Sequence, residues 1–545
     1  MRAALTVFLT TAAFLAAPAA NAAPPAPQVT VGADIKQLIF DWDSVSGAGY
    51  YRLLYKIGGG AYKPLIDNIP ASSTQVKLSV AVHLQSWPMI RYAVAACNTS
   101  GCTNSTAIFP QNLMLDSIGY FKASNTDPGD NFGTSLVLSD DGRTLAVGAR
   151  LEGSNASGVN GNQADNSSKW SGAVYVFHRT SSGWRQEAYL KAGVNQPQQF
   201  FGSSLFQNRG AVAINANGSL LAVSAPNQDV GGNREAGVVY VYQRSSSGSW
   251  SLAATLNAPT PLPFDLFGYS VDMSLDGRTL KVDSFGPRVQ VGPDQDYLFR
   301  THIFVRPGIT WQHSVTLAGA VDGDQCQNTR LSRDGNTLVS TCDNYLTVRQ
   351  LETFKRSGNT WTNVAAQPLS TGASGIGLAL DFDASTMALQ EARYLERGIV
   401  GIYRWTGATW AREAGIPPPA APDNIYAIDF GRALALSRTG NLVAIGDSSV
   451  AEDGAGVSLI SRPGPLTTGA VYIWKRDDRN ATWNMRSVVK SPNPRSGAGF
   501  GGALAMCGTG HALAVGADLE DSKAKGVDGD RTDHSAQGAG AAYLY

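Results

Sequence analysis

Two loops in this sequence carry closely spaced oxygen-bearing side chains in the same pattern. The segments GVNGNQADNSS and GVDGDRTDHSA both read Gly-Val-x-Gly-x-x-x-Asp. Their oxygen-bearing residues are Asn160, Asn162 and Asp165 in the first loop and Asp528, Asp530 and Asp533 in the second. Alternating carboxylate and amide oxygens on a glycine-bent loop form a ligand set that calcium prefers. The sequence therefore predicts a calcium site in the second loop, and a less charged one in the first.

The same residues have a second interpretation. Asn and Asp side chains often accept hydrogen bonds from backbone N–H groups one or two residues further on, and repeated Gly sets the shape of a loop. The two loops would then share a pattern because they share a conformation, without a metal ion. The sequence leaves both alternatives open.

No catalytic motif accompanies these loops. The chain has no Gly-x-Ser-x-Gly, His-Glu-x-x-His or Cys-x-x-Cys segment, and its six His are scattered. A His without partners is more often a surface or turn residue than a base or a ligand. We therefore predict no catalytic residue and no cofactor other than calcium, although acidic residues from distant segments can still converge in a folded ring.

The elements that would position these loops recur along the 545-residue chain. The segment FGTSLVLSDDGRTLAVGA returns in related form at five Phe-Gly pairs and in two weaker copies, which begin at Phe132, Phe201, Phe267, Phe430, Phe500, Thr329 and Ile376. A second apolar pair such as GAVYVFHRTSSGWRQEAYLKA follows the first. Four short strands recurring every ~50 to 70 residues are typical of a propeller blade. The sequence therefore predicts an all-β fold, with a seven-bladed β-propeller of four-stranded blades over residues 115–545.

The seventh copy lacks a fourth strand, because its third strand, GAAYLY, ends the sequence at Tyr545. The segment SIGYFKAS, residues 117–124, precedes the first Phe-Gly and resembles the fourth strands QEAYLKA and RSVVKS. We predict that residues 117–124 pair with the final blade. This pairing would close the ring and leave no open sheet edge.

Phe-Gly units followed by AVGA and GAVYV strands resemble the FG-GAP repeats of integrin alpha propellers. The resemblance implies a seven-bladed propeller, in which Gly lets neighbouring backbones approach and Phe fills the space between sheets. Integrin-type repeats often carry Asp-x-Asp-x-Asp-Gly-x-x-Asp between their first and second strands. The turns SDDGRTL, LDGRTL and RDGNTL keep only the terminal Asp-Gly, so calcium binding is not carried over to them.

Residues 27–110 contain short alternating runs such as LIFDWD, YYRLLYKI and IRYAVAAC, broken by Gly, Pro and Asn. This pattern predicts an antiparallel sandwich of about seven strands. With Trp42, Tyr51, Tyr55 and Tyr92, the segment resembles a fibronectin type III domain. In that family a Tyr at the position of Tyr92 commonly forms a corner hydrogen bond.

The N-terminal segment predicts export. Residues 1–22 have a basic start, an apolar stretch and an Ala-Asn-Ala ending, the layout of a cleaved signal peptide, and a Pro-rich leader covers residues 23–28. An exported protein can form disulfides, and we predict two local ones, Cys97–Cys102 and Cys326–Cys342. Cys507 is left over as a buried apolar residue. A secreted or periplasmic location follows.

Charge and hydropathy exclude two classes of partner. Lys plus Arg and Asp plus Glu both number 43, and no basic run could neutralise a phosphate backbone, so we predict no nucleic-acid partner. No segment after the signal peptide approaches the ~20 apolar residues of a membrane span. The oligomeric state is not predicted.

The two faces of the predicted propeller differ in the length of their connections. The turn face carries the first-to-second and third-to-fourth turns, which are short in this sequence. The loop face carries the second-to-third loops, which are long, polar and Gly-rich at 150–171, 226–236, 284–300, 447–468 and 518–538. Because loops on a rigid scaffold carry most binding sites, we predict recognition at the loop face.

Three functions fit this organisation. The first is an exported binding or adhesion-type protein that recognises an extracellular protein or glycan with its loop face. The second is a secreted polysaccharide hydrolase or lyase, which would place carboxylates, Arg and Tyr together at the mouth of the ring. The third is a structural, envelope-associated scaffold.

Overall fold

The computed structural model describes residues 22–203, 210–286, 288–291, 294–318, 325–343, 349–369, 377–391, 398–419 and 429–545. The predicted signal peptide lies outside these residues apart from Ala22. The chain divides into two compact units, one comprising residues up to 32, 38–78 and 86–113, and the other 33–37, 79–85 and 114–545. Among the described residues, no helix has the length and apolar character needed to cross a membrane.

The first part of the chain forms two sheets from seven strands. The strands are β1 (Val29–Asp34), β2 (Gln37–Trp42), β3 (Tyr50–Ile57), β4 (Lys63–Pro70), β5 (Gln75–Ser79), β6 (Ile90–Asn98) and β7 (Gly101–Asn104). The sheet orders are β1-β2-β5 and β4-β3-β6-β7. Buried and half-buried residues alternate along β2, as the period-two pattern predicts.

Trp42, Tyr51 and Tyr92 are buried and Tyr55 is half-buried, but the expected tyrosine hydrogen bond differs. The Phe40 and Tyr92 rings are 5.5 Å apart, and the Trp42 and Tyr51 rings are 5.1 Å apart. Within the described residues the Tyr92 hydroxyl makes no hydrogen bond, whereas Tyr51 accepts one from the Val45 N–H at 2.8 Å. Among these residues the corner bond expected of Tyr92 is therefore missing, and the hydroxyl that anchors a backbone turn belongs to Tyr51.

The cysteines follow the predicted pairing as far as the structure describes them. Cys97 and Cys102 form a disulfide across the turn between β6 and β7. Cys342 is disulfide-bonded, and the residue opposite it in the strand register is Cys326, whose side chain lies outside the described residues. Cys507 is free and buried.

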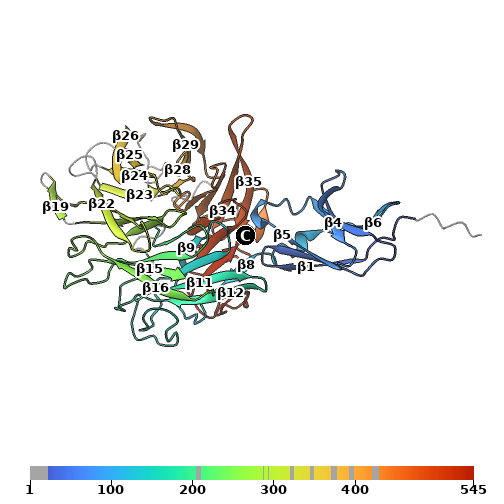
Figure 1. Ribbon diagram of the computed structural model, residues 1–545, viewed down its shortest axis with the longest axis horizontal. Helices are drawn as coiled ribbons and strands as arrows, with labels where there is room; N and C mark the ends of the chain where they lie inside the picture. The colour runs from blue at the N-terminus through green and yellow to red at the C-terminus, as the bar shows by residue number, and fades with distance from the viewer. Residues whose placement is uncertain are drawn as a thin grey trace, which may run out of the picture. The chain divides into compact units, whose positions relative to one another are not determined.

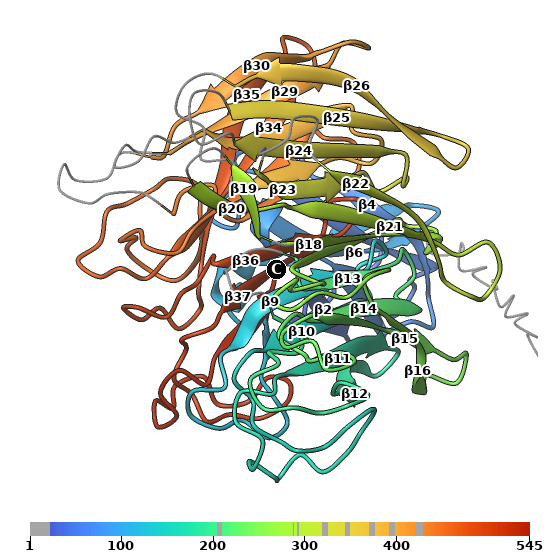
Figure 2. The ribbon, with the colours of Figure 1, turned by 90° about the vertical axis from the view of Figure 1, so that its left-hand side faces the viewer.

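The second part of the chain is a β-propeller (Figures 1 and 2). Within the described residues it contains seven sheets of four or five strands, besides one short two-stranded sheet. In sheet order the strands are β9 (Phe132–Leu138), β10 (Thr144–Ala149), β11 (Ala173–Thr180) and β12 (Gly183–Leu190); β13 (Val212–Ile214), β14 (Leu220–Ala225), β15 (Val238–Arg244) and β16 (Trp250–Leu256); β17 (Ser270–Met273), β18 (Thr279–Ser284), β21 (Arg300–Val305) and β22 (Gln312–Ala318); β23 (Gln325–Leu331), β24 (Thr337–Asp343), β25 (Arg349–Ser357) and β26 (Thr360–Pro368); β27 (Leu378–Leu380), β28 (Thr386–Glu391), β29 (Ile399–Trp405) and β30 (Trp410–Ile416); β31 (Leu434–Leu436), β32 (Leu442–Asp447), β34 (Ala470–Asp477) and β35 (Thr482–Lys490), with β33 (Gly456–Ser458) on the edge of β35; and β36 (Ala503–Met506), β37 (Leu513–Ala517), β38 (Ala541–Leu544) and β8 (Gly119–Phe121).

The sheets follow one another around a closed ring. Their first strands contact each other in the order β9, β13, β17, β23, β27, β31, β36 and back to β9. Strand β8 pairs with β38 and places Tyr120 opposite Tyr543, so the segment predicted to complete the last sheet does so. Figure 2 shows the sheet that ends in β26 lying between those that end in β22 and β30.

Two predicted loops contain strands of their own. In the loop at 284–300, β19 (Arg288–Val291) pairs with β20 (Asp294–Tyr297), and in the loop at 447–468, β33 pairs with β35. The alternating Arg-Val-Gln-Val segment of β19 suits a strand. Strand β33 covers the outer edge of β35 that would otherwise be unpaired.

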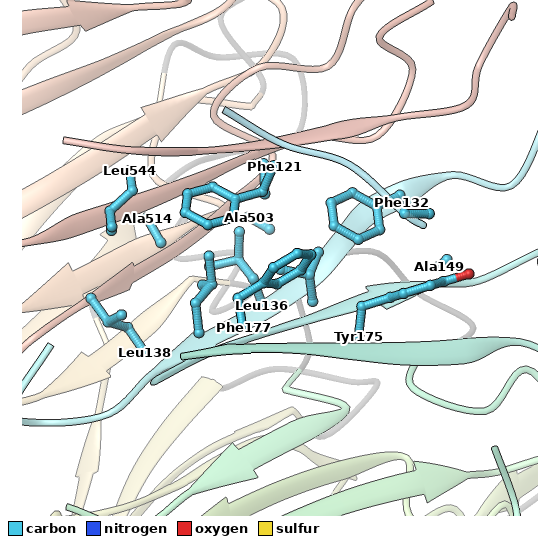
Figure 3. Packing of buried hydrophobic residues seen from close by; sticks show 14 of the residues in the cluster. Phe121, Phe132, Leu136, Leu138, Ala149, Tyr175, Phe177, Ala503, Ala514 and Leu544 are labelled. Carbon is cyan, nitrogen blue, oxygen red and sulfur yellow. The ribbon is translucent and has the colours of Figure 1, made fainter. Parts of the chain in front are cut away.

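The Phe-Gly pairs lock one sheet onto the preceding one. The Phe132 N–H donates to the Ala539 carbonyl at 2.9 Å, and equivalent bonds join Phe201 to Ser171 and Phe267 to Ala236. Figure 3 shows the Phe132 ring near Leu136, Tyr175 and Phe177, with Ala503, Ala514 and Leu544 of the last sheet in the same cluster. The recurring spacing of the repeat thus serves the contact between sheets.

The first-to-second turns are joined by a second closed circle. Every turn donates one backbone N–H to a carbonyl of the turn in the next sheet, at 2.8–3.3 Å. The pairs, with the donor first, are Gly508–Asp140, Arg438–Gly508, Phe382–Arg438, Asp334–Phe382, Leu275–Arg333, Ala216–Leu275 and Asp141–Ala216. This circle holds the turn residues of all seven sheets at fixed places around the axis.

We expect Gly133→Ala to destabilise the propeller strongly. Gly133 has φ +97°, and a Cβ there would lie 2.3 Å from the Ala541 carbonyl oxygen. Backbone strain and overpacking should together lower the free energy of unfolding by roughly 2 to 5 kcal/mol, measured by urea denaturation. Gly158→Ala is the matched control, because Gly158 has φ +72° with no atom within 4 Å of the added Cβ. Equal losses in both variants would contradict the close-contact explanation.

Candidate functional site

The two matched loops are fastened to the outermost strand of their sheets. Asn160 donates from its N–H to the Tyr189 carbonyl at 2.8 Å, and its Oδ1 accepts from the Tyr189 N–H at 2.9 Å. Asp528 repeats this geometry with Tyr120, at 2.8 and 3.1 Å. The first oxygen-bearing residue of each loop therefore acts as a bridge to a strand.

The other predicted ligands shape the loops locally. Oδ1 of Asp165 accepts from the Asn155 and Ser167 N–H groups, and Oδ1 of Asp533 accepts from those of Lys523 and Ser535, all at 2.8–3.0 Å. Asn162 and Asp530 each accept from the N–H two residues further on. These backbone bonds lower the pKa of Asp533 to about 2. The bonds are those of the second interpretation, in which Asx residues set the conformation of the loop.

Calcium binding stays a prediction. Within the described part of the chain, no group of three or more His, Cys, Asp or Glu is placed to hold a metal ion. The side chains of Asp528, Asp530 and Asp533 each turn toward a backbone N–H of this chain, so the geometry gives the proposed site no support.

A buried ion pair lies under the first loop. The Lys191 ammonium is 2.7 Å from Glu152, and both side chains are fully buried. Glu152 also accepts from the Tyr189 hydroxyl at 2.8 Å and the Ser154 N–H at 3.1 Å, while Lys191 donates to Ser171 Oγ at 2.7 Å. Burial lowers the pKa of Lys191, and Glu152 opposes that shift. The loop is thus built around an ammonium group that belongs to the chain itself.

The last sheet repeats this arrangement. Lys122 lies 2.8 Å from Glu520, both are 1% exposed, and the Tyr120 hydroxyl donates to Glu520 at 3.1 Å. In the sixth sheet Glu452 accepts from the Tyr472 hydroxyl at 3.0 Å. The two ion pairs were not predicted, although the sequence carries a signal for them. A Glu follows AVGA in both GARLE and GADLE, and a Lys ends the fourth-strand segments YLK and YFK.

An axial cavity of about 210 Å³ lies between the first strands of the seven sheets. Most of its lining is Ala, Val, Leu, Ile and Met, and the charged residues are Asp272, Arg330, Arg333 and Arg432. Asp272 is the one carboxylate among the described lining residues, and it pairs with Arg330 at 3.1 Å and with Lys281 at 3.4 Å. The described lining therefore lacks the pair of carboxylates that glycoside hydrolysis uses.

A second cavity of about 300 Å³ lies on the loop side, among small residues of the first, sixth and seventh sheets. Its lining includes Gly133, Thr134, Ser448, Thr467 and Asp518. Burial raises the pKa of Asp518 to about 6. The walls of this cavity are formed mainly by Gly, Ser and Thr.

An aromatic platform stands on the loop face beside the first loop. Trp170 is 36% exposed, and its ring stacks on that of Phe200, with centroids 6.2 Å apart and planes at 23°. Lys169 lies 4.3 Å from the Trp170 centroid, and Arg150 lies 5.0 Å from that of Phe200. The platform thus combines one partly exposed aromatic residue with two cationic groups.

Comparison with known proteins finds no relative by sequence. No family model matches the chain, and no curated protein matches it. The β-propeller domain of Cps50 (Swd1) from Myceliophteria thermophila is 10% identical over 78% of this chain and 99% of that chain, with a TM-score of 0.45. The periplasmic gluconolactonase PpgL of Pseudomonas aeruginosa is 13% identical over 82% and 98%, with a TM-score of 0.37. At these values the likeness says nothing about activity.

We expect stability to fall as buried acids on the loop side ionise. Burial raises the pKa of Asp130 to about 7 and that of Asp447 to about 6. A carboxyl group whose pKa is raised in the folded state contributes its full stabilisation below pH ~4, where it is protonated in both states. This contribution is lost as the pH rises through 6 to 7 and the folded protein must ionise the buried group. Asp130→Asn should therefore shrink the loss of unfolding free energy between pH 4 and 8 by on the order of 3 kcal/mol, measured by urea denaturation at each pH. The exposed Asp478→Asn is the control, and an unchanged pH profile in Asp130→Asn would refute the assignment.

Proposed function

We propose that this protein is an exported binding protein that recognises an extracellular protein or glycan with its loop face. In this proposal a fibronectin type III-like domain precedes a seven-bladed propeller of the FG-GAP type, and the signal peptide directs both to the periplasm or the exterior. The observation that carries the proposal is the Trp170 platform, a partly exposed aromatic residue beside a loop that is held by buried polar bonds.

Rigidity of the loop supports recognition at this place. The first loop is fixed by the Glu152–Lys191 pair and by the Asn160 bridge, so little conformational entropy is lost when a ligand binds. Trp is among the residues that most often dominate binding energy at interfaces. The neighbouring Lys169 and Arg150 favour a ligand with acidic groups.

The two other functions have less support. A polysaccharide hydrolase or lyase would need convergent carboxylates and Tyr, and the described lining of the axial cavity has one paired carboxylate and no Tyr. An envelope-associated scaffold would use the same loop face for assembly, and differs in having a partner from its own cell.

We expect Trp170→Ala to weaken ligand binding at least about tenfold, because the partly exposed indole ring is lost. Binding of the full chain to immobilised acidic glycans and extracellular matrix proteins would be measured by biolayer interferometry. Ile309→Ala is the control, since Ile309 is a large apolar residue that is 88% exposed in a third-to-fourth turn. If a ligand binds equally to the wild type and Trp170→Ala, the platform is not the site. Turnover of a polysaccharide without stable binding would favour the hydrolase or lyase.

A further inference from the structure

The turn-face end of the axial cavity brings together charged residues from three different sheets. Asp140, Arg333 and Arg438 occupy equivalent positions in the first-to-second turns of the first, fourth and sixth sheets, and the circle of backbone hydrogen bonds fixes all three around the axis. We call these three residues and Phe382, which holds the same position in the fifth sheet, the axial mouth.

Among the described residues, the Arg333 guanidinium has no hydrogen-bond acceptor and only a distant carboxylate. Its side chain lines the axial cavity and is 31% exposed. Within the described residues it donates no hydrogen bond, and its one ion pair, with Asp140, spans 3.7 Å, which is too long for a hydrogen bond. Burial lowers the pKa of Arg333, which is the electrostatic cost of a cation that its surroundings do not fully compensate.

Asp140 lies between two arginines and forms a hydrogen bond with only one of them. Its Oδ2 accepts a hydrogen bond from Arg438 Nη2, while its Oδ1 is buried without a hydrogen-bond partner among the described residues. One carboxylate therefore faces two guanidinium groups. Asp140, Arg333 and Arg438 together carry a net positive charge, and Arg333 donates no hydrogen bond within the described residues.

The acidic groups deeper in the ring are paired with other cations, and Asp272 offsets only part of the charge of Arg333. Asp272 is engaged by Arg330 and Lys281, and Asp283 accepts from Lys281 at 2.8 Å and from the Thr301 hydroxyl at 2.8 Å. Phe382 adds an apolar wall at the mouth, where it is 36% exposed and lies 5.5 Å from the Arg438 guanidinium carbon. A cationic donor set beside an apolar wall suits a small organic anion.

We propose that the axial mouth binds the oxyanion group, carboxylate or phosphate, of a small ligand, with Arg333 as the main donor and Arg438 as the second. Asp140 holds Arg438 in place and competes with the ligand for both guanidinium groups. This site lies at the opposite end of the propeller from the Trp170 platform and does not depend on recognition at the loop face.

The test is isothermal titration calorimetry of the full chain with sodium galacturonate and with inorganic phosphate, at constant ionic strength, with galactose as the uncharged control. We expect binding of at least one anion and none of galactose. Binding of galacturonate alone would identify a carboxylate site, and binding of phosphate alone a phosphate site. No binding of either anion at up to about 10 mM would overturn the proposal, since salt ions would screen and displace a ligand that binds more weakly than this.

Two variants and a control separate this site from nonspecific attraction. Arg333→Met should weaken anion binding about tenfold or more, because charge-assisted hydrogen bonds are lost. Asp140→Asn should strengthen it about twofold or more, since a competing carboxylate is removed. Arg479→Met removes a 90% exposed arginine and should change nothing. Unchanged binding in Asp140→Asn, or equal losses in Arg333→Met and Arg479→Met, would contradict the assignment. The Asp140→Asn variant tests the proposal even if Arg333→Met fails to fold.

Discussion

The backbone circle that joins the seven first-to-second turns is the constraint on which the rest of the propeller depends. Each turn donates or accepts a hydrogen bond with the turns on either side, and no sheet can be left out without breaking two bonds. The Phe-Gly contacts act further out and, where the pair is present, pack a sheet against the one before it. Together these contacts turn a linear repeat into a ring, in which residues far apart in sequence meet at the axis.

The loop face depends on a different interaction. Long polar loops on a propeller rim would ordinarily be mobile, and a bound cation is a common way to order them. Here the Lys191 and Lys122 ammonium groups are supplied by the sheets and meet Glu152 and Glu520 of the loops. A buried pair of this kind adds little net stability, but removing one partner is costly, so it specifies one loop conformation.

Much of the fold could be predicted because its signals are local and repeated. The Phe-Gly pairs, the strand spacing and the closing segment at 117–124 can each be recognised from neighbouring residues. The observed sheets and the pairing of β8 with β38 agree with these predictions. The site could not be predicted in the same way. Asp140 and Arg438 are 298 residues apart, and nothing in SDDG or SRTG distinguishes them from ordinary turns. The Asx pattern of the loops was visible, but sequence alone could not separate ligands for a metal from acceptors for backbone N–H groups.

If the internal ion pairs order the loops of the recognition face, these loops keep one conformation without a metal. Hydrogen–deuterium exchange of the full chain, followed by mass spectrometry in EDTA and in millimolar calcium, tests this role of the ion pairs most directly. The Asn160 and Asp528 N–H groups donate to the Tyr189 and Tyr120 carbonyls, so we expect slow exchange in both loops, equal in the two conditions. Fast exchange in EDTA that becomes slow when calcium is added would contradict this role and favour the calcium site.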